Sequence, residues 1–192
     1  LEIIEEIAAE AMRAGEILHS LHRFASKAEP NRTAVDLRDL VHEVTRLFDS
    51  DIRRHGIVLR LDLEENLPEV YVERIQIQQV VVNLVRNAFD ALLEDRRSER
   101  EVIVRARAVE TGVLVSIADN GKNLSPDLYA KIFSPYFTTK KNGMGMGLSI
   151  CRSIVGSHGS QLRASPNVDC GLTFTFTLPY NATESAPDKS GV

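Results

Sequence analysis

The sequence predicts an α+β fold that carries an additional helix of the bundle-forming kind at its N-terminus. Two patterns support this prediction. Residues 1–29 repeat apolar side chains at helical spacing along one stripe. From residue 33 to residue 179, segments with helical spacing are interspersed with segments in which apolar and polar residues alternate, as in strands that bury one face. Residues 180–192 have no apolar periodicity, and we expect them to form a disordered tail.

The amino-acid composition limits the classes of protein to which this chain can belong. The 192 residues are 43% hydrophobic and 26% charged, as is usual for a globular chain, and no run approaches the roughly 18 apolar residues of a membrane helix. A net charge of −4 without a basic stripe argues against nucleic acid as a partner. Cys151 and Cys170 lack metal-ligand spacing, which favours a reducing compartment. We expect a cytoplasmic location without membrane contact, whether or not a longer parent is membrane-anchored.

The N-terminal segment is predicted to be an amphipathic helix. Its apolar positions alternate in steps of four and three: Ile4, Ile7, Ala11, Ala14, Leu18, Leu21, Ala25 and Ala28. Such a stripe needs neighbouring helices to cover it, so we expect an element for oligomerisation or docking. Pro30 disfavours helix at the residue before it, which places a domain boundary there. Because the sequence begins inside this predicted helix, we expect it to be part of a longer protein.

The elements after Pro30 follow from local patterns. Asp36 is a suitable N-cap for a second helix, and Gly56 is a natural C-terminal stop for it. Glu110-Thr111-Gly112 suits a hairpin turn. In chain order we expect a helix between residues 36 and 56, strands over 57–63 and 70–72, a long helix over 74–96, strands over 102–109 and 113–118, a helix over 148–158 and a closing strand through 174–178.

Three alternate glycines, Gly143, Gly145 and Gly147, stand immediately before the predicted helix that begins near Leu148. Without side chains, their backbone N–H groups can approach a phosphate, and a helix N-terminus favours anions. The spacing is neither that of a Walker A loop nor that of a dinucleotide-binding fingerprint. A phosphate site and a merely flexible linker remain alternatives for this segment taken alone.

Two asparagines, Asn83 and Asn87, lie four residues apart on the long predicted helix, so their amides project from one face. Amide oxygens are suitable ligands for Mg²⁺ in a nucleotide site. The alternative is that both amides only bond neighbouring backbone.

A third motif, residues 119–123, follows an apolar strand directly. The Asp119 carboxylate at the strand end can accept a hydrogen bond from an exocyclic amine such as that of adenine, although an aspartate here can also be a simple turn-former. Residues 133–140 are too aromatic for an ordinary solvated loop. With Lys140 close to the glycines, they predict a mobile lid whose cation reaches phosphate.

The four motifs, in this order, closely resemble the catalytic and ATP-binding region of bacterial sensor histidine kinases, members of the Bergerat-fold ATPases. Residues 83–91 are similar to the N box, 119–123 to the G1 box, 133–137 to the F box and 143–147 to the G2 box. The resemblance covers residues 33–179 and implies a two-layer α/β sandwich. Residues 1–29 look like the second helix of the family's dimerisation and phosphoacceptor hairpin, whose first helix would lie upstream.

The resemblance also implies roles for individual residues. Asn87, helped by Asn83, would hold Mg²⁺, and Asp119 would read adenine beside Gly121. Phosphates would lie on the glycines and the adjoining Leu148, with Lys140 assisting in catalysis together with the two asparagines. Thr173 falls where the family often places a residue near adenine. Implied partners are ATP, a response-regulator receiver domain and a second copy of the chain bound through the N-terminal helix.

Two departures from the family pattern stand out. Asn123 replaces the second glycine of the G1 box, and we expect this to be tolerated because asparagine enters left-handed backbone readily. No histidine in the sequence has a convincing phosphoacceptor context, since His42-Glu43 is not followed by the expected Asn-Pro pair. Three rival functions remain: an ATP-hydrolysing conformational switch, a nucleotide-sensing module without catalysis, and a serine kinase of the anti-sigma type.

Overall fold

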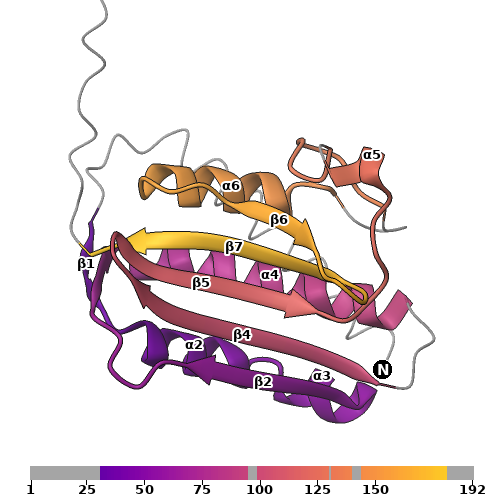
Figure 1. The fold of residues 1–192 in the computed structure, drawn as a ribbon, viewed down its shortest axis with the longest axis horizontal. Helices are drawn as coiled ribbons and strands as arrows, with labels where there is room; N and C mark the ends of the chain where they lie inside the picture. Colours follow the sequence, from indigo (N-terminus) through magenta and orange to yellow (C-terminus); the bar gives the residue numbers. More distant parts are fainter. Residues whose placement is uncertain (1–30, 95–98, 130, 140–143, 181–192) are drawn as a thin grey trace, which may run out of the picture. The chain divides into compact units, whose positions relative to one another are not determined.

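The computed structural model describes residues 31–94, 99–129, 131–139 and 144–180 (Figure 1). The predicted N-terminal helix, the domain boundary at Pro30 and the predicted tail from residue 181 lie outside these ranges and stay predictions. The elements in chain order are β1 (Thr33–Val35), α2 (Leu37–Arg46), α3 (Asp49–His55), β2 (Ile57–Leu63), β3 (Val70–Val72), α4 (Arg74–Glu94), β4 (Arg100–Val109), β5 (Gly112–Asp119), α5 (Pro126–Tyr129), α6 (Gly147–Ser157), β6 (Arg163–Pro166) and β7 (Leu172–Pro179).

A five-stranded mixed sheet forms one layer, in the order β2-β4-β5-β7-β6. β2 pairs in parallel with β4, and the remaining neighbours are antiparallel. β1 and β3 form a separate two-stranded sheet. The register places Asp119 opposite Val102 and Ala118 opposite Thr173, so β5 ends between two strands that continue to support it.

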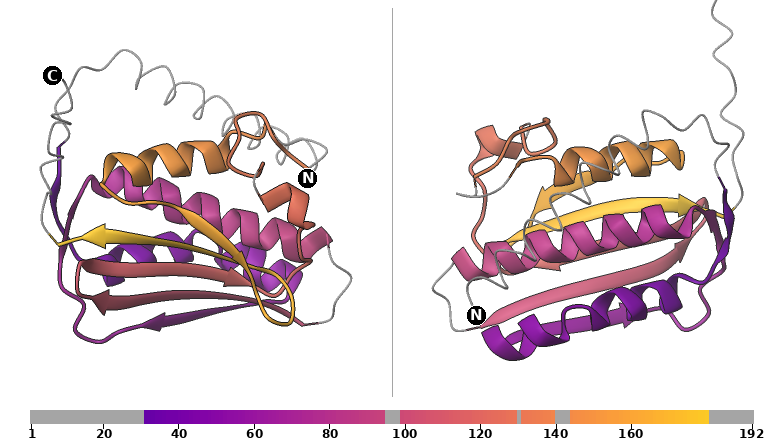
Figure 2. Two further views of the ribbon diagram at one scale, coloured as in Figure 1. Left: turned by 45° about the horizontal axis from the view of Figure 1, so that its top comes forward. Right: turned by 180° about the vertical axis from the view of Figure 1, so that it is seen from behind.

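Helices form the second layer and cover one face of the sheet (Figure 2). α4 packs against β4 and β5 and is flanked by α2 and α6. The apolar face of α4, which includes Val80, Leu84 and Ala88, is buried in one core with strand residues such as Ile117 and Phe176. Burial of this continuous apolar surface is the main stabilising contribution. The two-layer α+β prediction is confirmed.

The segment between Asp36 and Gly56 differs from the single helix predicted for it. The Asp36 carboxylate does cap α2, accepting from the Arg38 N–H at 2.7 Å, and Gly56 ends α3 in a left-handed conformation (φ 61°). Between them the chain turns at Leu47, and a second helix begins. The turn lets Phe48 pack edge-on against Phe89 of α4, with ring centroids 5.2 Å apart. A packing contact with a distant helix therefore interrupts a locally continuous helical pattern.

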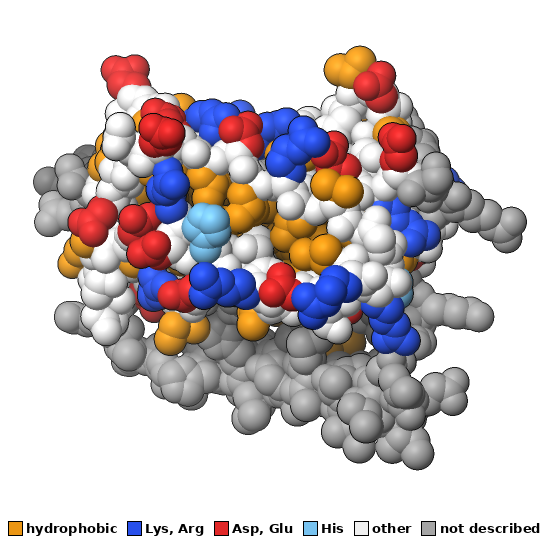
Figure 3. All heavy atoms as spheres, turned by 90° about the horizontal axis from the view of Figure 1, so that it is seen from below, with side chains coloured by type: hydrophobic (Ala, Val, Ile, Leu, Met, Phe, Trp, Pro, Cys, Tyr) orange, Lys and Arg blue, Asp and Glu red, His pale blue; other side chains and the backbone are white. Residues whose placement is uncertain are grey.

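Charged side chains of both signs are interspersed on the side of the molecule that carries β2 (Figure 3). Oppositely charged side chains pair across β2 and β4: Arg60 with Glu101 at 2.9 Å, and Arg105 with Asp62 at 3.3 Å. Arg107 also binds the Asp62 carboxylate, and this hydrogen bond holds the pKa of Asp62 below its usual value. No helix in the described ranges combines the length and apolar character needed to cross a membrane.

Candidate functional site

Asp119, the last residue of β5, is an ionisable side chain buried at a strand end. Only 4% of its surface is exposed. Its carboxylate accepts the Gly121 N–H at 2.9 Å and a further backbone hydrogen bond from Leu172. Burial disfavours the charged form more strongly than these bonds favour it, and it raises the pKa of Asp119 to about 6. A buried acceptor that titrates close to neutral pH is the chemical feature expected of a recognition site rather than of a plain turn.

Two glycines allow the backbone to pass closely by Asp119. A Cβ on Gly121 would stand 3.1 Å from the carbonyl oxygen of Ala91 in α4, so the chain after β5 lies directly on that helix. A Cβ on Gly171 would stand 2.0 Å from the carbonyl oxygen of Asp119, and Gly171 has φ 85°. The sequence predicts Gly121 as part of the site, but the role of Gly171 depends on a contact between distant segments.

The predicted asparagine pair lies on α4, and Asn83 lies beside the start of α6. Asn83 and Asn87 are both half-buried. A Cβ on Gly147 would be 3.8 Å from the Asn83 amide oxygen, an ordinary van der Waals distance. The structure thus brings Asn83 next to the glycine loop, although 63 residues separate them in the sequence.

The part of the glycine loop that the structure describes, from Gly145 to Gly147, packs closely on the aromatic segment before it. Gly145 adopts φ 66°, and its Cα lies against backbone atoms of Tyr136 and Phe137, 2.5 Å from where a Cβ would be. α6 then begins at Gly147 without a side-chain cap. Uncapped N–H groups at a helix start are available to an anion. Leu148 is half-buried and packs on the core. Gly143 and Lys140 lie outside the described residues.

The aromatic segment before the glycines packs partly on the domain. Phe133 meets Phe174 of β7 edge-on at 6.4 Å, and the Arg152 guanidinium lies 5.6 Å from the Phe133 ring centroid. Tyr136, by contrast, is 77% exposed and adopts φ 65°.

Asn123, which replaces a glycine of the G1 box, does not adopt the left-handed backbone that we expected it to need. Among the described residues, Tyr136 is the one non-glycine residue with positive φ.

Thr173, the predicted site residue on β7, lies on a different face of the sheet from the Asp119 side chain. β7 pairs Thr173 with Ala118, so by strand alternation its side chain lies on the opposite face of the sheet from Asp119 and Phe174. Its hydroxyl donates to Asn167 Oδ1 at 2.5 Å. Asn167 is not predictable from the sequence as a partner of this site, because the residue types in its turn do not by themselves indicate a role.

The histidines in the described ranges include one with a clear structural role. His158 caps α6 and is 2% exposed. Its Nε2 accepts the Glu73 N–H at 3.1 Å, and its Nδ1 lies 2.8 Å from the Ile154 carbonyl oxygen. This pattern requires the neutral ring, and burial lowers the pKa of His158 accordingly. His42 is exposed on α2.

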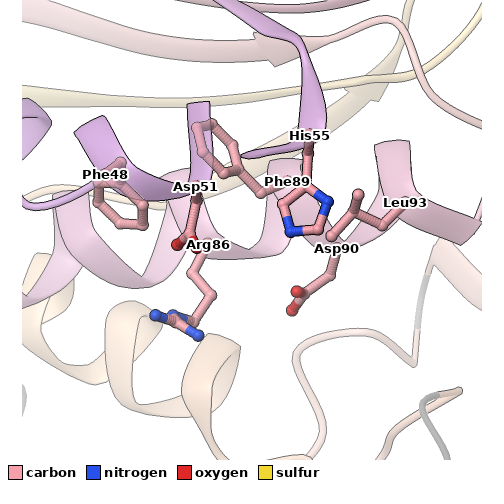
Figure 4. Close-up of a pocket in the computed structure, with 7 residues that line it drawn as sticks. All are labelled: Phe48, Asp51, His55, Arg86, Phe89, Asp90 and Leu93. Atoms are coloured by element: carbon pink, nitrogen blue, oxygen red, sulfur yellow. The ribbon is translucent and has the colours of Figure 1, made fainter. Parts of the chain in front are cut away.

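A hollow of about 100 Å³ lies between α3 and the C-terminal half of α4 (Figure 4). Its lining is Phe48, Asp51, His55, Arg86, Phe89, Asp90 and Leu93. None of the predicted site residues is among these, and the hollow mixes charges of both signs around an aromatic base.

The fold and site define an ATPase domain of the type found in sensor histidine kinases. Over residues 72–182 the chain matches the family described as histidine kinase-, DNA gyrase B-, and HSP90-like ATPase, and it belongs to this family. It is 37% identical to the sensor protein FixL of Bradyrhizobium diazoefficiens, covering 92% of this chain and 35% of FixL. It is 36% identical to the C4-dicarboxylate transport sensor protein DctS of Rhodobacter capsulatus, covering 97% and 28%. The chain therefore spans about a third of the length of these relatives.

Solved structures agree with this assignment. The catalytic domain of histidine kinase ThkA superimposes with a TM-score of 0.70 at 34% identity, covering 78% of this chain and 96% of that one. ThkA in complex with the response regulator protein TrrA gives a TM-score of 0.74 at 29% identity, covering 93% and 50%.

Proposed function

We propose that this chain binds Mg-ATP and presents the γ-phosphate to a phosphoacceptor histidine on another polypeptide segment, from which an aspartate of a response regulator takes the phosphoryl group. The observation that carries the proposal is the buried carboxylate of Asp119, which accepts from Gly121 where the chain lies on α4 at Ala91, one helical turn beyond Asn87. The family match supports ATP as the ligand. The complex of a similar kinase with a response regulator supports the second transfer.

Each group has a defined part in this proposal. Asp119 accepts the exocyclic amine of adenine, and Gly121 keeps the backbone close enough for the base to lie on α4. Asn87, with Asn83, supplies amide oxygen to Mg²⁺, which neutralises phosphate charge. The backbone of Gly143, Gly145 and Gly147, next to Leu148, holds the phosphates, and Lys140 adds a cation.

Transfer to a histidine is favoured over hydrolysis by the identity of residue 83. The resemblance places Asn83 where hydrolysing relatives have a glutamate general base. An amide cannot take a proton from an attacking water, so a supplied nucleophile is the better substrate. A nucleotide-sensing module without catalysis is the second candidate.

The decisive test of nucleotide recognition is Asp119→Asn. The amide presents a donor where the carboxylate only accepts, so affinity for ATP should fall on the order of tenfold or more, and the preference for ATP over GTP should shrink. Calorimetric titration with both nucleotides measures this. Asp49→Asn, an exposed carboxylate on α3, is the matched control and should bind as the unmodified chain does. Unchanged affinity and preference in Asp119→Asn would remove Asp119 from the site.

The phosphoryl acceptor can be tested by labelling. With γ-labelled ATP we expect no label on this chain, because none of its five histidines has a phosphoacceptor context. Acid-labile label on His19, His22 or His42 would contradict the assignment.

We also propose that residues 1–29 pair with a second copy of the chain in a helical bundle. Leu18→Glu together with Leu21→Glu places charges in the apolar stripe and should reduce self-association in sedimentation experiments while ATP affinity stays the same. Loss of ATP binding in a folded double variant would mean that this segment belongs to the ATP-binding domain.

A further inference from the structure

The loop between β6 and β7, residues 167–171, packs on the end of β5. Asn167 Nδ2 donates to the backbone carbonyl of Asp119 at 2.7 Å, and the Cys170 thiol donates to the carbonyl of Asn120 at 3.2 Å. Gly171 lies against the Asp119 carbonyl so closely that no side chain fits. Within the loop, the Asn167 N–H donates to the Gly171 carbonyl at 3.0 Å. The loop is therefore shaped to meet the strand end.

The Asn167 amide has one orientation in this arrangement. A carbonyl oxygen can only accept, so the group facing the Asp119 carbonyl is the amide N–H₂. The remaining amide oxygen then accepts the Thr173 hydroxyl at 2.5 Å. Thr173 thus fixes the amide, and the amide fixes the main chain of Asp119.

The position of this contact matters because the pairing of β5 with β7 ends there, while Asp119 still pairs with Val102 of β4. The β5–β7 register ends at the pair Ala118 and Thr173, so the carbonyl of Asp119 lies beyond the strand pairing with β7. Asn167 supplies a partner that a buried carbonyl requires. On the other side, the Asp119 carboxylate is held by the Gly121 N–H at 2.9 Å. Asp119 is consequently fixed both at its main chain and at its side chain.

Resting on the proposed role of Asp119 in adenine recognition, we propose that Asn167 is a positioning residue of the nucleotide site and that Thr173 acts through it. Neither side chain touches the nucleotide. Together they hold the main chain of Asp119 so that its carboxylate meets the base without reorganisation, as a supporting group does for a binding residue.

The test uses near-isosteric changes and a double-mutant cycle. Thr173→Val removes the hydroxyl and releases the Asn167 amide, and it should weaken ATP binding about threefold to tenfold, the effect of one lost hydrogen bond. Asn167→Asp sets an acceptor against the Asp119 carbonyl and should weaken binding at least as much. Thr173→Ser keeps the donor and should restore binding to within about twofold. Thr175→Val, one pleat along the same face of β7, is the control and should leave affinity unchanged.

The cycle separates positioning from a general effect on the fold. In the Asp119→Asn background, Thr173→Val should have almost no further effect on ATP affinity, because the group that it positions is gone. An equal loss in both backgrounds would overturn the proposal and leave a purely structural role. Unchanged affinity in Thr173→Val and Asn167→Asp would also overturn it, even where Asp119→Asn weakens binding. If Asp119→Asn itself has no effect, the proposed adenine contact fails instead.

Discussion

The two ends of the candidate site are built differently. At the Asp119 end, meaning Asp119 with Gly121 and Gly171, the functional carboxylate is 4% exposed and its neighbours lie at backbone contact distance. At the glycine-loop end, meaning Asn83 and Asn87 with the loop from Gly145 to Gly147, the side chains are half-buried, and the Asn83 amide has ordinary van der Waals separation from Gly147.

This difference matches the two kinds of ligand that we propose for the ends. A flat base is recognised by a hydrogen-bond acceptor that is already in place and shielded from water. Burying this carboxylate destabilises the free protein, and the hydrogen bond to the ligand offsets that cost. Phosphates and a hydrated cation are large and charged, and they need groups that water and substrate can reach. Substitutions at the first end should therefore change folding as well as binding, whereas those at the second should change binding with little effect on folding.

The largest expected effect is that of Gly171→Ala on stability. The new Cβ would stand 2.0 Å from the Asp119 carbonyl, and φ 85° is unfavourable for alanine. We expect the free energy of unfolding to fall by about 3 kcal/mol, measured by urea denaturation. Gly156→Ala is the matched control, since Gly156 lies inside α6 with nothing within 4 Å of an added Cβ. That change should stabilise slightly. Equal stability of both variants would contradict the close packing of the β6–β7 loop.

The next effect is a pH dependence of stability at Asp119. Its pKa is raised to about 6 in the folded chain against 3.8 as the ordinary value. The folded state therefore holds a proton that the unfolded state has released, and stability falls as pH rises from about 4 through 6. Relative to Asp119→Asn, the unmodified chain should lose about 2 kcal/mol over this interval, since one pKa unit corresponds to about 1.4 kcal/mol. A pH-independent difference between the two chains would show that Asp119 is not desolvated.

At the other end, Gly145→Ala should affect binding more than folding. Its Cβ would be 2.5 Å from the carbonyl oxygen of Phe137, in the loop rather than in the sheet, so the loop can shift without unfolding the domain. We expect ATP affinity to fall about tenfold and the free energy of unfolding to change by less than about 1 kcal/mol. A Cβ on Gly147 would make only ordinary van der Waals contacts, so Gly147→Ala should leave stability unchanged. Any loss of ATP affinity in this variant would mean that the added methyl group obstructs the ligand. A large loss of stability in Gly145→Ala would remove the contrast between the ends.

The smallest expected effect is that of Asn87→Ala. Removing one amide oxygen from Mg²⁺ should weaken ATP binding about fivefold with Mg²⁺ and hardly at all with EDTA, because water can replace one ligand of the cation. Paired titrations with and without Mg²⁺ measure this difference. Asn66→Ala, an exposed residue before β3, should bind as the unmodified chain does under both conditions. An equal loss with EDTA would assign Asn87 a contact other than the metal.

The elements and the site motifs could be predicted from the sequence to different degrees. The long helix α4 and the strands on either side of residue 112 could be predicted because their apolar residues recur regularly over a long stretch of contiguous sequence. The break at Leu47 and the short edge strand β6 could not, because the first depends on packing of Phe48 against Phe89 and the second on a neighbour, β7, that the local pattern does not reveal. The sequence indicates that Asp119 and Asn83 can bind a ligand, but it does not reveal that they lie beside Gly171 and Gly147, respectively.

The sequence by itself determined the class of the fold, the family motifs and the residue types able to bind a base, a cation and phosphate, since these depend on periodicity and on side-chain chemistry at fixed spacing. Only the tertiary structure decided which side of the sheet each side chain occupies. It places Thr173 behind Asp119 rather than beside it, and it turns Asn167 toward the Asp119 carbonyl. The physical reason is that strand register and loop packing join segments some 50 residues apart, and neither follows from the pattern within one segment.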